Sequence, residues 1–385
     1  MKIDDEGMSL VRGVAALVVV VAHAIQIFIL RLLGADHMVA KVAGLVAAQA
    51  VFVFFIVSGY LITLSIIKNT QRNNGAFNLF EYASARIARI YPPLTFAVVL
   101  CLILWALMRV YSLPGNDSVG AISYGMPNDL YAARKFFSIG FDDIKNAFLM
   151  NNGLLQVNGP LWSLCIEWRI YLAAACLGVL VTTKSWLQRI FWGTLFLIIL
   201  NKMKAVDGNA YFYALIWATG SFVAIWAQCK FKMVSLKLFW VAPLLILISV
   251  WIFDPEFFLS SRSLSDSKDR ALQFVFCLFW LGILFPRFEY RKSLFVRVMM
   301  HLGDFSYTLF IIHFPLMLFL LSVAQDYVGY SVVLSLIVAM SSIGLALILS
   351  CYAGRVVENK RLFSTIIDSW SFALINVLKS VRLGR

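Results

Sequence analysis

The chain has 385 residues, of which 61% are hydrophobic and only 14% are charged. This composition excludes a soluble globular enzyme and indicates a polytopic membrane protein. The formal net charge of +13 does not require nucleic acid as a partner, because the basic residues fall mainly in alternate loops, as the positive-inside rule expects. The six cysteines lie scattered in apolar segments, so we predict neither a metal site nor a disulfide framework.

Apolar segments of spanning length predict an all-α fold with about ten transmembrane helices surrounding an intramembrane cavity. The expected spans are residues 9–33, 42–67, 91–110, 160–182, 188–201, 211–228, 238–253, 270–286, 301–324 and 331–353. The distribution of Lys and Arg between the loops predicts that both termini are cytoplasmic. We expect one transmembrane domain over residues 1–362, followed by a cytoplasmic tail, 363–385, with the spacing of a weak interfacial helix.

The first span carries two ionisable residues, Arg12 and His23, eleven residues apart. At 3.6 residues per turn this spacing places both side chains on one helix face, with His23 roughly 16 Å farther along the axis. Ionisable groups within lipid are costly and usually face a polar cavity. The alternatives are an arginine that extends to the membrane surface and a histidine that only hydrogen-bonds a neighbouring helix.

Two small residues, Ser58 and Gly59, lie in the second span. Small residues let helices approach closely, so helix packing explains them most simply. A direct chemical role for Ser58 is the alternative.

A pair of arginines, Arg86 and Arg89, precedes the third span and lies on one helix face. Pro92 and Pro93 follow, and we expect them to mark the start of that span. Arginines at a cytoplasmic membrane surface are commonly topological anchors. They could also bind the phosphates of a cytoplasmic ligand, because guanidinium groups match phosphate geometry.

A long polar segment, residues 112–159, leads into a span that contains an acid. Ser163 and Glu167 are four residues apart and share a helix face, and Glu167 is expected about 10 Å inside the outer end of the span. An acid at that depth needs a partner or a water-filled site. Arg169 is a possible counter-ion, and a purely structural ion pair is the alternative.

A second deep histidine, His313, follows Ser306 by seven residues on the same face of a later span. Pro315 is expected to kink the helix beside it. His313 is compatible with a residue that lines a cavity and equally with a hydrogen-bonded packing residue.

Five segments in chain order resemble motifs of the membrane-bound acyltransferase-3 family, whose members O-acylate cell-surface carbohydrates. The segments are RGVAALVVVVAH, FVFFIVSGYLI, RIARIYP, PLWSLCIEW and SYTLFIIHFPL. Each string is weak alone, but five in order at plausible spacings are specific. Two positions depart from the pattern, since Trp168 stands where a polar or acidic residue is common and Phe310 where tyrosine is usual.

The resemblance implies acyl transfer, usually of acetyl, from cytoplasmic acyl-CoA to a hydroxyl of an extracytoplasmic carbohydrate or lipid-linked glycan, at the bacterial inner membrane. It implies no metal and no nucleic acid; acetyl-CoA is the expected donor and membrane lipids are the surroundings. Expected catalytic residues are His23, as general base or acyl carrier, and Glu167. The donor is expected to bind Arg12, Arg86 and Arg89. The acceptor is expected to bind Trp162, Ser163 and His313.

The runner-up from the residues is a proton-coupled transporter that uses His23 and Glu167 as a relay. No inverted repeat with paired broken helices supports it. A non-catalytic partner in polysaccharide assembly is a third possibility. The acyltransferase hypothesis makes a geometric prediction: Arg12, His23 and Glu167 should line one cavity, continuous across the membrane but narrow or plugged at rest.

Overall fold

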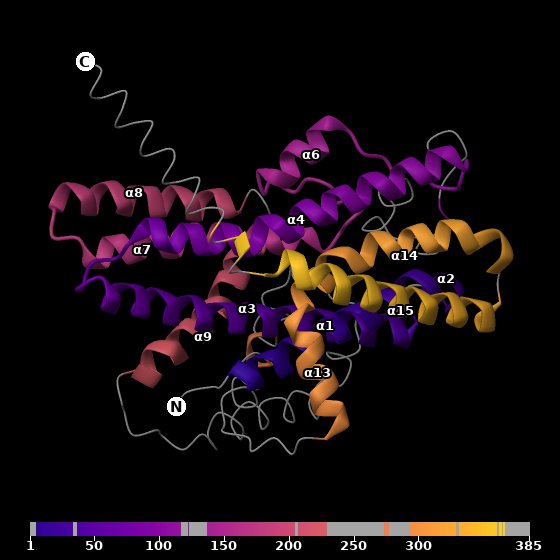
Figure 1. The fold of residues 1–385 in the computed structure, drawn as a ribbon, viewed down its shortest axis with the longest axis horizontal. Helices are drawn as coiled ribbons and strands as arrows, with labels where there is room; N and C mark the ends of the chain where they lie inside the picture. Colours follow the sequence, from indigo (N-terminus) through magenta and orange to yellow (C-terminus); the bar gives the residue numbers. More distant parts are fainter. Residues whose placement is uncertain are drawn as a thin grey trace.

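A computed structural model describes residues 5–33, 37–116, 122, 137–204, 207–228, 273–276, 293–328, 331–359, 362–363 and 365. Within these residues the fold is all-helical, as predicted, with 11 α-helices and one π-helical segment (Figure 1). The predicted span 238–253 lies outside the described residues. So do 270–286, apart from residues 273–276, and nearly all of the tail 363–385.

The described elements follow the chain from α1 to α15. They are α1 (Asp5–Ala24), the π-helix η1 (Ile25–Ile29), α2 (Leu30–Leu33), α3 (Met38–Arg72), α4 (Leu79–Val110), α6 (Phe141–Phe148), α7 (Leu161–Thr182), α8 (Trp186–Met203), α9 (Ala210–Gln228), α13 (Leu294–Asp304), α14 (Ser306–Val328) and α15 (Val332–Val357).

Seven of the described helices are long and apolar enough to cross a membrane. They are Glu6–Ile29, Met38–Arg72, Leu79–Val110, Leu161–Thr182, Ala210–Gln228, Ser306–Val328 and Val332–Val357. Helix α8 was also predicted to span, at 188–201, but it is not among the seven, because polar residues at both of its ends leave a shorter apolar stretch.

Helix α4 starts well before the position predicted from its prolines. It begins at Leu79, where the side chain of Asn78 caps the helix by accepting from Glu81 N at 3.1 Å, and it continues through Pro92 and Pro93. The helix therefore starts before the prolines and not at them. As a result, Arg86 and Arg89 belong to the same helix as the span and not to a preceding surface segment.

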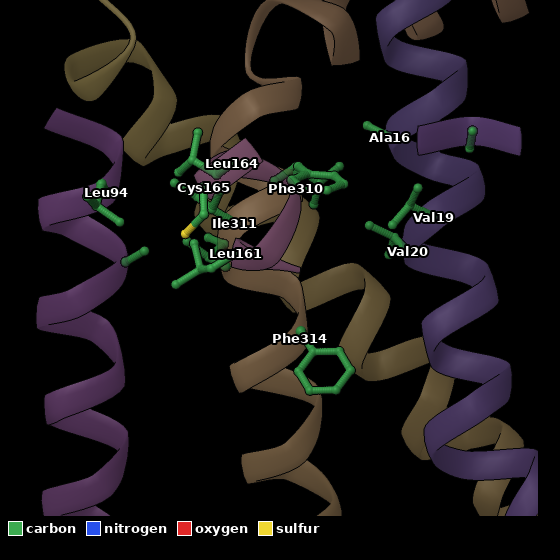
Figure 2. Close-up of a cluster of buried hydrophobic side chains, with 14 of the residues drawn as sticks. Ala16, Val19, Val20, Leu94, Leu161, Leu164, Cys165, Phe310, Ile311 and Phe314 are labelled. Atoms are coloured by element: carbon green, nitrogen blue, oxygen red, sulfur yellow. The ribbon is translucent and has the colours of Figure 1, made fainter. Parts of the chain in front are cut away.

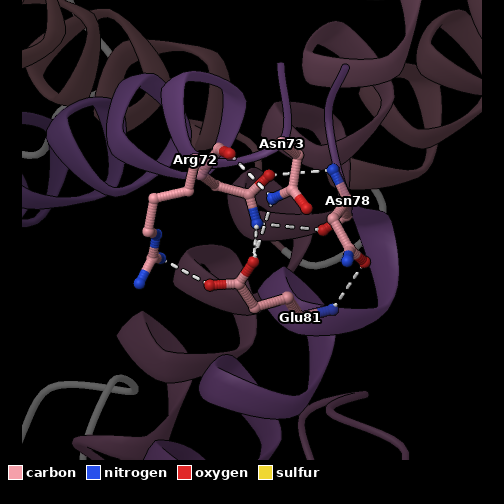
Figure 3. A network of polar contacts seen from close by, with 5 residues as sticks. Arg72, Asn73, Asn78 and Glu81 are labelled. Atoms are coloured by element: carbon pink, nitrogen blue, oxygen red, sulfur yellow. Dashed lines mark hydrogen bonds and ion pairs between the residues drawn. The ribbon is translucent and has the colours of Figure 1, made fainter. Parts of the chain in front are cut away.

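A polar network fixes the turn between α3 and α4 (Figure 3). Glu81 Oε2 accepts from Asn69 Nδ2 at 3.0 Å and from Asn73 Nδ2 at 3.2 Å, while its other oxygen pairs with Arg72. Asn69 also accepts from Asn78 N at 2.8 Å. These bonds hold the two helices as a hairpin, which sets the position of Ser58 relative to Arg89.

Two pairs of glycines bring helix backbones into direct contact. A Cβ built on Gly59 of α3 would lie 2.0 Å from a backbone oxygen of α9, and one on Gly220 of α9 would lie 2.0 Å from a backbone oxygen of α3. In the same way, a Cβ built on Gly13 of α1 would lie 1.9 Å from a backbone oxygen of α13, and one on Gly303 of α13 would lie 1.9 Å from a backbone oxygen of α1. The close approach predicted at Ser58-Gly59 is thus confirmed.

Candidate active site

A small polar cavity lies where α1, α3, α4, α7 and α14 meet. It holds about 60 Å³ and has apolar side chains around its polar ones. The polar lining residues are Arg12, Ser58, Arg89, Ser163, Glu167, Ser306 and Tyr307. Four of the predicted site residues, Arg12, Arg89, Ser163 and Glu167, are therefore brought together.

Arg12 is held by α14 and by the residue that follows α15. Its Nη2 donates to Ser306 Oγ at 3.0 Å and lies 3.9 Å from Glu358 Oε2. The other oxygen of Glu358 accepts from the backbone N–H of Thr308 at 2.8 Å and from its hydroxyl at 2.7 Å. Burial raises the pKa of the Glu358 carboxyl above its usual range. One carboxyl group thus joins Arg12 to the first turn of α14.

Glu167 accepts hydrogen bonds from two hydroxyl groups. Ser58 Oγ of α3 donates to Glu167 Oε1 at 2.8 Å, and the Tyr171 hydroxyl donates to the same oxygen. The predicted counter-ion, Arg169, has other contacts: it donates to the carbonyl oxygens of Met150 and Cys165. The prediction of Arg169 as partner was wrong because residues two apart on a helix lie on nearly opposite faces.

Arg86 and Arg89 have different surroundings. The guanidinium of Arg86 lies over the rings of Tyr82 and Tyr171, 5.6 and 5.8 Å from their centroids. Arg89 lines the cavity and interacts electrostatically with Glu167. Both arginines lie against the protein interior, and Arg89 is the one of the two that lines the cavity.

His23 and His313 form a second cluster, away from the cavity. Their ring centroids are 5.3 Å apart, and His23 Nδ1 lies 2.7 Å from Gln26 Oε1. His313 is fully buried, and its Nδ1 lies 2.9 Å from the Leu309 carbonyl oxygen. Neither histidine lines the cavity. Arg12 and His23 do share a helix face, as predicted, since both contact α14.

An apolar layer separates the cavity from the two histidines. Ala16, Val19 and Val20 lie between Arg12 and His23 along α1, and they face Phe310 and Phe314 of α14 (Figure 2). Phe310 is both part of the cavity wall and a neighbour of His313, with ring centroids 6.2 Å apart. The prediction of one cavity shared by Arg12, His23 and Glu167 therefore holds only for Arg12 and Glu167.

Trp162 was predicted to bind the acceptor but lies outside the cavity lining. Its ring packs against Tyr213 of α9, with centroids 4.9 Å apart. Ser163, the next residue, does line the cavity. This difference follows from the helix, because successive residues are turned by about 100°.

Comparison with known proteins identifies the family. A family model described as an acyltransferase domain matches residues 5–355. The chain belongs to the acyltransferase-3 family. It is 27% identical over 139 residues to an uncharacterized protein of Haemophilus influenzae, a match that covers 34% of this chain and 49% of the relative. The chain thus spans about half the length of the curated relative it matches. No solved structure matches the chain.

Membership of the acyltransferase-3 family, together with the long apolar helices, indicates an integral membrane protein. It also favours an acyltransferase over the transporter alternative. Each of the five acyltransferase-3 segments contributes at least one side chain to the cavity. These side chains are Arg12, Ser58, Arg89, Ser163, Glu167, Ser306, Tyr307 and Phe310, among others.

Several residues of this acyltransferase-3 site were missed in the sequence. Tyr171 follows Glu167 by four residues, so helical periodicity could have found it. Tyr307 stands inside a family segment, beside Ser306. Glu358 comes after the last described helix, where no local pattern indicates that its carboxyl group reaches α1 and α14.

Proposed function

We propose that this protein transfers an acetyl group from cytoplasmic acetyl-CoA to a hydroxyl of an extracytoplasmic carbohydrate or lipid-linked glycan, in the inner membrane of a bacterium. The observation that carries the proposal is that all five family segments meet at one polar cavity within an apolar bundle. Charged groups in such surroundings are rare without a functional reason.

The arginines are proposed to bind the donor. Coenzyme A is an anion, and Arg12, Arg86 and Arg89 present guanidinium groups in or beside the cavity. Guanidinium groups recognise phosphate oxygens in pairs, which an ammonium group cannot do. Glu167 and Ser163 are proposed to orient the acceptor hydroxyl, because both line the same cavity.

His23 is proposed as the general base. Its Nδ1 lies 2.7 Å from Gln26 Oε1, and imidazole titrates in the range that this chemistry needs. In the described structure Phe310 and its apolar neighbours lie between His23 and the cavity. The proposal therefore requires that ligands displace Phe310 before the histidine acts.

The experiment compares surface glycans of cells with and without this protein for base-labile acetyl esters. We expect esters only with the protein, and their loss in His23→Ala and Glu167→Gln chains that still insert into the membrane. Unchanged surface esters on removal of the protein would overturn the proposed function. Normal esters with His23→Ala would remove His23 from the mechanism and leave Glu167 as the candidate base.

Donor binding is tested separately on purified protein in detergent, with acetyl-CoA as the probe. Arg89→Lys and Arg86→Lys keep the charge but lose the planar fork, so both should bind acetyl-CoA more weakly than the parent chain at low salt. Arg189→Lys, an exposed arginine of α8, is the matched control. Equal affinity in all four proteins would show that Arg86 and Arg89 are not donor-binding residues.

A further inference from the structure

The hydrogen-bonding groups around the cavity are not equally occupied. The oxygen of Glu167 that accepts from Ser58 and Tyr171 already has two donors. Arg12 already donates to Ser306 and lies beside Glu358. These contacts hold the walls of the cavity together, and they occupy one oxygen of Glu167 and one nitrogen of Arg12.

Two donors on residues of the cavity wall have no such contacts within the described part of the chain. The buried hydroxyl of Tyr307 has no hydrogen-bond partner there. Arg89 makes no hydrogen bond or ion pair with a described residue, although it interacts electrostatically with Tyr307 and Glu167. A buried polar group without a partner costs about 1–3 kcal/mol. Such a group at a cavity indicates a ligand atom that completes it.

The Tyr307 hydroxyl and the Arg89 guanidinium favour one kind of ligand atom, a hydrogen-bond acceptor. A guanidinium can only donate hydrogen bonds, and a phenol hydroxyl in the same cavity wall donates most favourably to an electron-rich oxygen. The cavity holds about 60 Å³, which is roughly the space of two water molecules or of a group the size of acetyl. These two donors suit an oxygen atom of a small group rather than a nucleotide or a sugar ring.

We infer that the Tyr307 hydroxyl and the Arg89 guanidinium bind the carbonyl oxygen of the acyl thioester and stabilise the oxyanion that forms on it. This inference rests on the proposed acyl transfer, assigns Arg89 to the acyl end of the donor rather than to its phosphates, and adds Tyr307 as a catalytic residue. Because the Tyr307 hydroxyl is enclosed in the described structure, the arriving acyl group must widen the cavity slightly to reach it.

The step balances without any further reactant. The acceptor hydroxyl gives its proton to the base, and its oxygen forms a bond to the thioester carbon while the carbonyl electron pair moves to the oxygen held by Tyr307 and Arg89. When the carbonyl re-forms, the carbon–sulfur bond breaks and the thiolate of coenzyme A takes the proton from the base. The products are the acyl ester and coenzyme A.

The test is the Tyr307→Phe substitution, which removes only the hydroxyl. We expect surface ester formation per molecule of protein to fall on the order of 100-fold, as for the loss of one oxyanion donor. The melting temperature should not fall, because the hydroxyl has no described partner to lose. Affinity for coenzyme A without an acyl group should equal that of the parent chain, since the lost contact is to the thioester oxygen.

The matched control is Tyr91→Phe, which removes a hydroxyl that donates to the Phe148 carbonyl oxygen at 3.2 Å, outside the cavity. It should leave ester formation unchanged. Parental ester formation with Tyr307→Phe, or an equal loss of affinity for coenzyme A itself, would overturn the inference while the proposed function stands. If the parent chain forms no ester, the proposed function fails and the inference fails with it.

Discussion

At the scale of single residues, two charged groups of the cavity, Glu167 and Arg12, are hydrogen-bonded to neutral hydroxyls. Ser58 and Tyr171 donate hydrogen bonds to Glu167, and Ser306 accepts one from Arg12. A hydroxyl can hydrogen-bond a charged group without neutralising it, so the cavity keeps both signs of charge available. An isolated ion pair would be more costly to bury and would offer less to a ligand.

We therefore expect Ser58 to act by holding the Glu167 side chain in position. We expect Ser58→Ala to lower the free energy of unfolding by about 1–3 kcal/mol, because it removes one donor from the half-buried carboxyl group of Glu167. Ester formation should fall as well, since Glu167 then has more rotational freedom. Thermal melting in detergent and analysis of surface esters measure the two effects. Ser185→Ala, at an exposed serine, is the control, and an equally stable Ser58→Ala chain would show that Tyr171 alone suffices.

At the scale of helices, a loop side chain replaces a backbone hydrogen bond that α14 lacks. A proline lacks the N–H that would donate to the carbonyl four residues earlier, and for Pro315 that carbonyl belongs to Ile311. The side chain of Asn158, which is fully buried, donates its Nδ2 to the Ile311 oxygen at 2.7 Å. The segment that precedes α7 is thereby joined to the helix that carries Ser306 and His313.

A double-mutant cycle tests this repair. Asn158→Ala should lower the free energy of unfolding by about 1–3 kcal/mol, since it leaves a buried carbonyl unpaired. Adding Pro315→Ala should recover part of the loss, because residue 315 then donates its own N–H to Ile311. Melting temperatures of the four chains give the coupling. If Pro315→Ala has the same effect with and without Asn158, the two residues are not coupled.

The glycine contacts between helices make a second prediction at this scale. Gly59→Ala should lower the free energy of unfolding by about 1–3 kcal/mol, because its Cβ would lie 2.0 Å from the Trp217 oxygen and force α3 and α9 apart. Gly44→Ala lies in the same helix, where no atom is within 4 Å of the new Cβ, so it should be neutral or slightly stabilising. Comparable melting temperatures for the two variants would contradict the contact.

At the scale of the whole molecule, the cavity joins helices that the sequence placed at different depths. Arg89 was expected at the cytoplasmic surface and Glu167 toward the outside, yet both line one cavity. The expectation assumed that every span starts at a membrane surface. Helices of 35 and 32 residues, such as α3 and α4, are longer than a bilayer requires, so distance from a helix end is a poor measure of depth.

The predicted topology is testable on intact cells with a membrane-impermeant thiol reagent. With a cytoplasmic N-terminus, Asp142→Cys should be labelled from outside and Ala76→Cys only after permeabilisation. Both positions are exposed, and the parent chain with its native cysteines is the blank. The reverse pattern would invert the orientation, and labelling of both on intact cells would contradict the assignment of the two loops to opposite sides.

Local patterns in the sequence identified much of the site, because helical spacing links residues of one face. Ser163 and Glu167 share the cavity as their spacing of four predicts. The same reasoning could not place His23, since a shared face with Arg12 says nothing about which side chains fill the distance between them. It also could not find Glu358, whose contact with Arg12 depends on how distant helices pack.

The π-helical segment Ile25–Ile29 begins two residues after His23. A π turn holds one residue more than an α turn, so the chain beyond it is rotated by about 100° relative to an unbroken helix. In an alignment of related chains this turn would look like a one-residue insertion directly after the histidine, with its two flanks matching in different registers. Removing one residue there would straighten the helix but turn Leu30–Leu33 away from their present neighbours and take Gln26 from its place beside the imidazole.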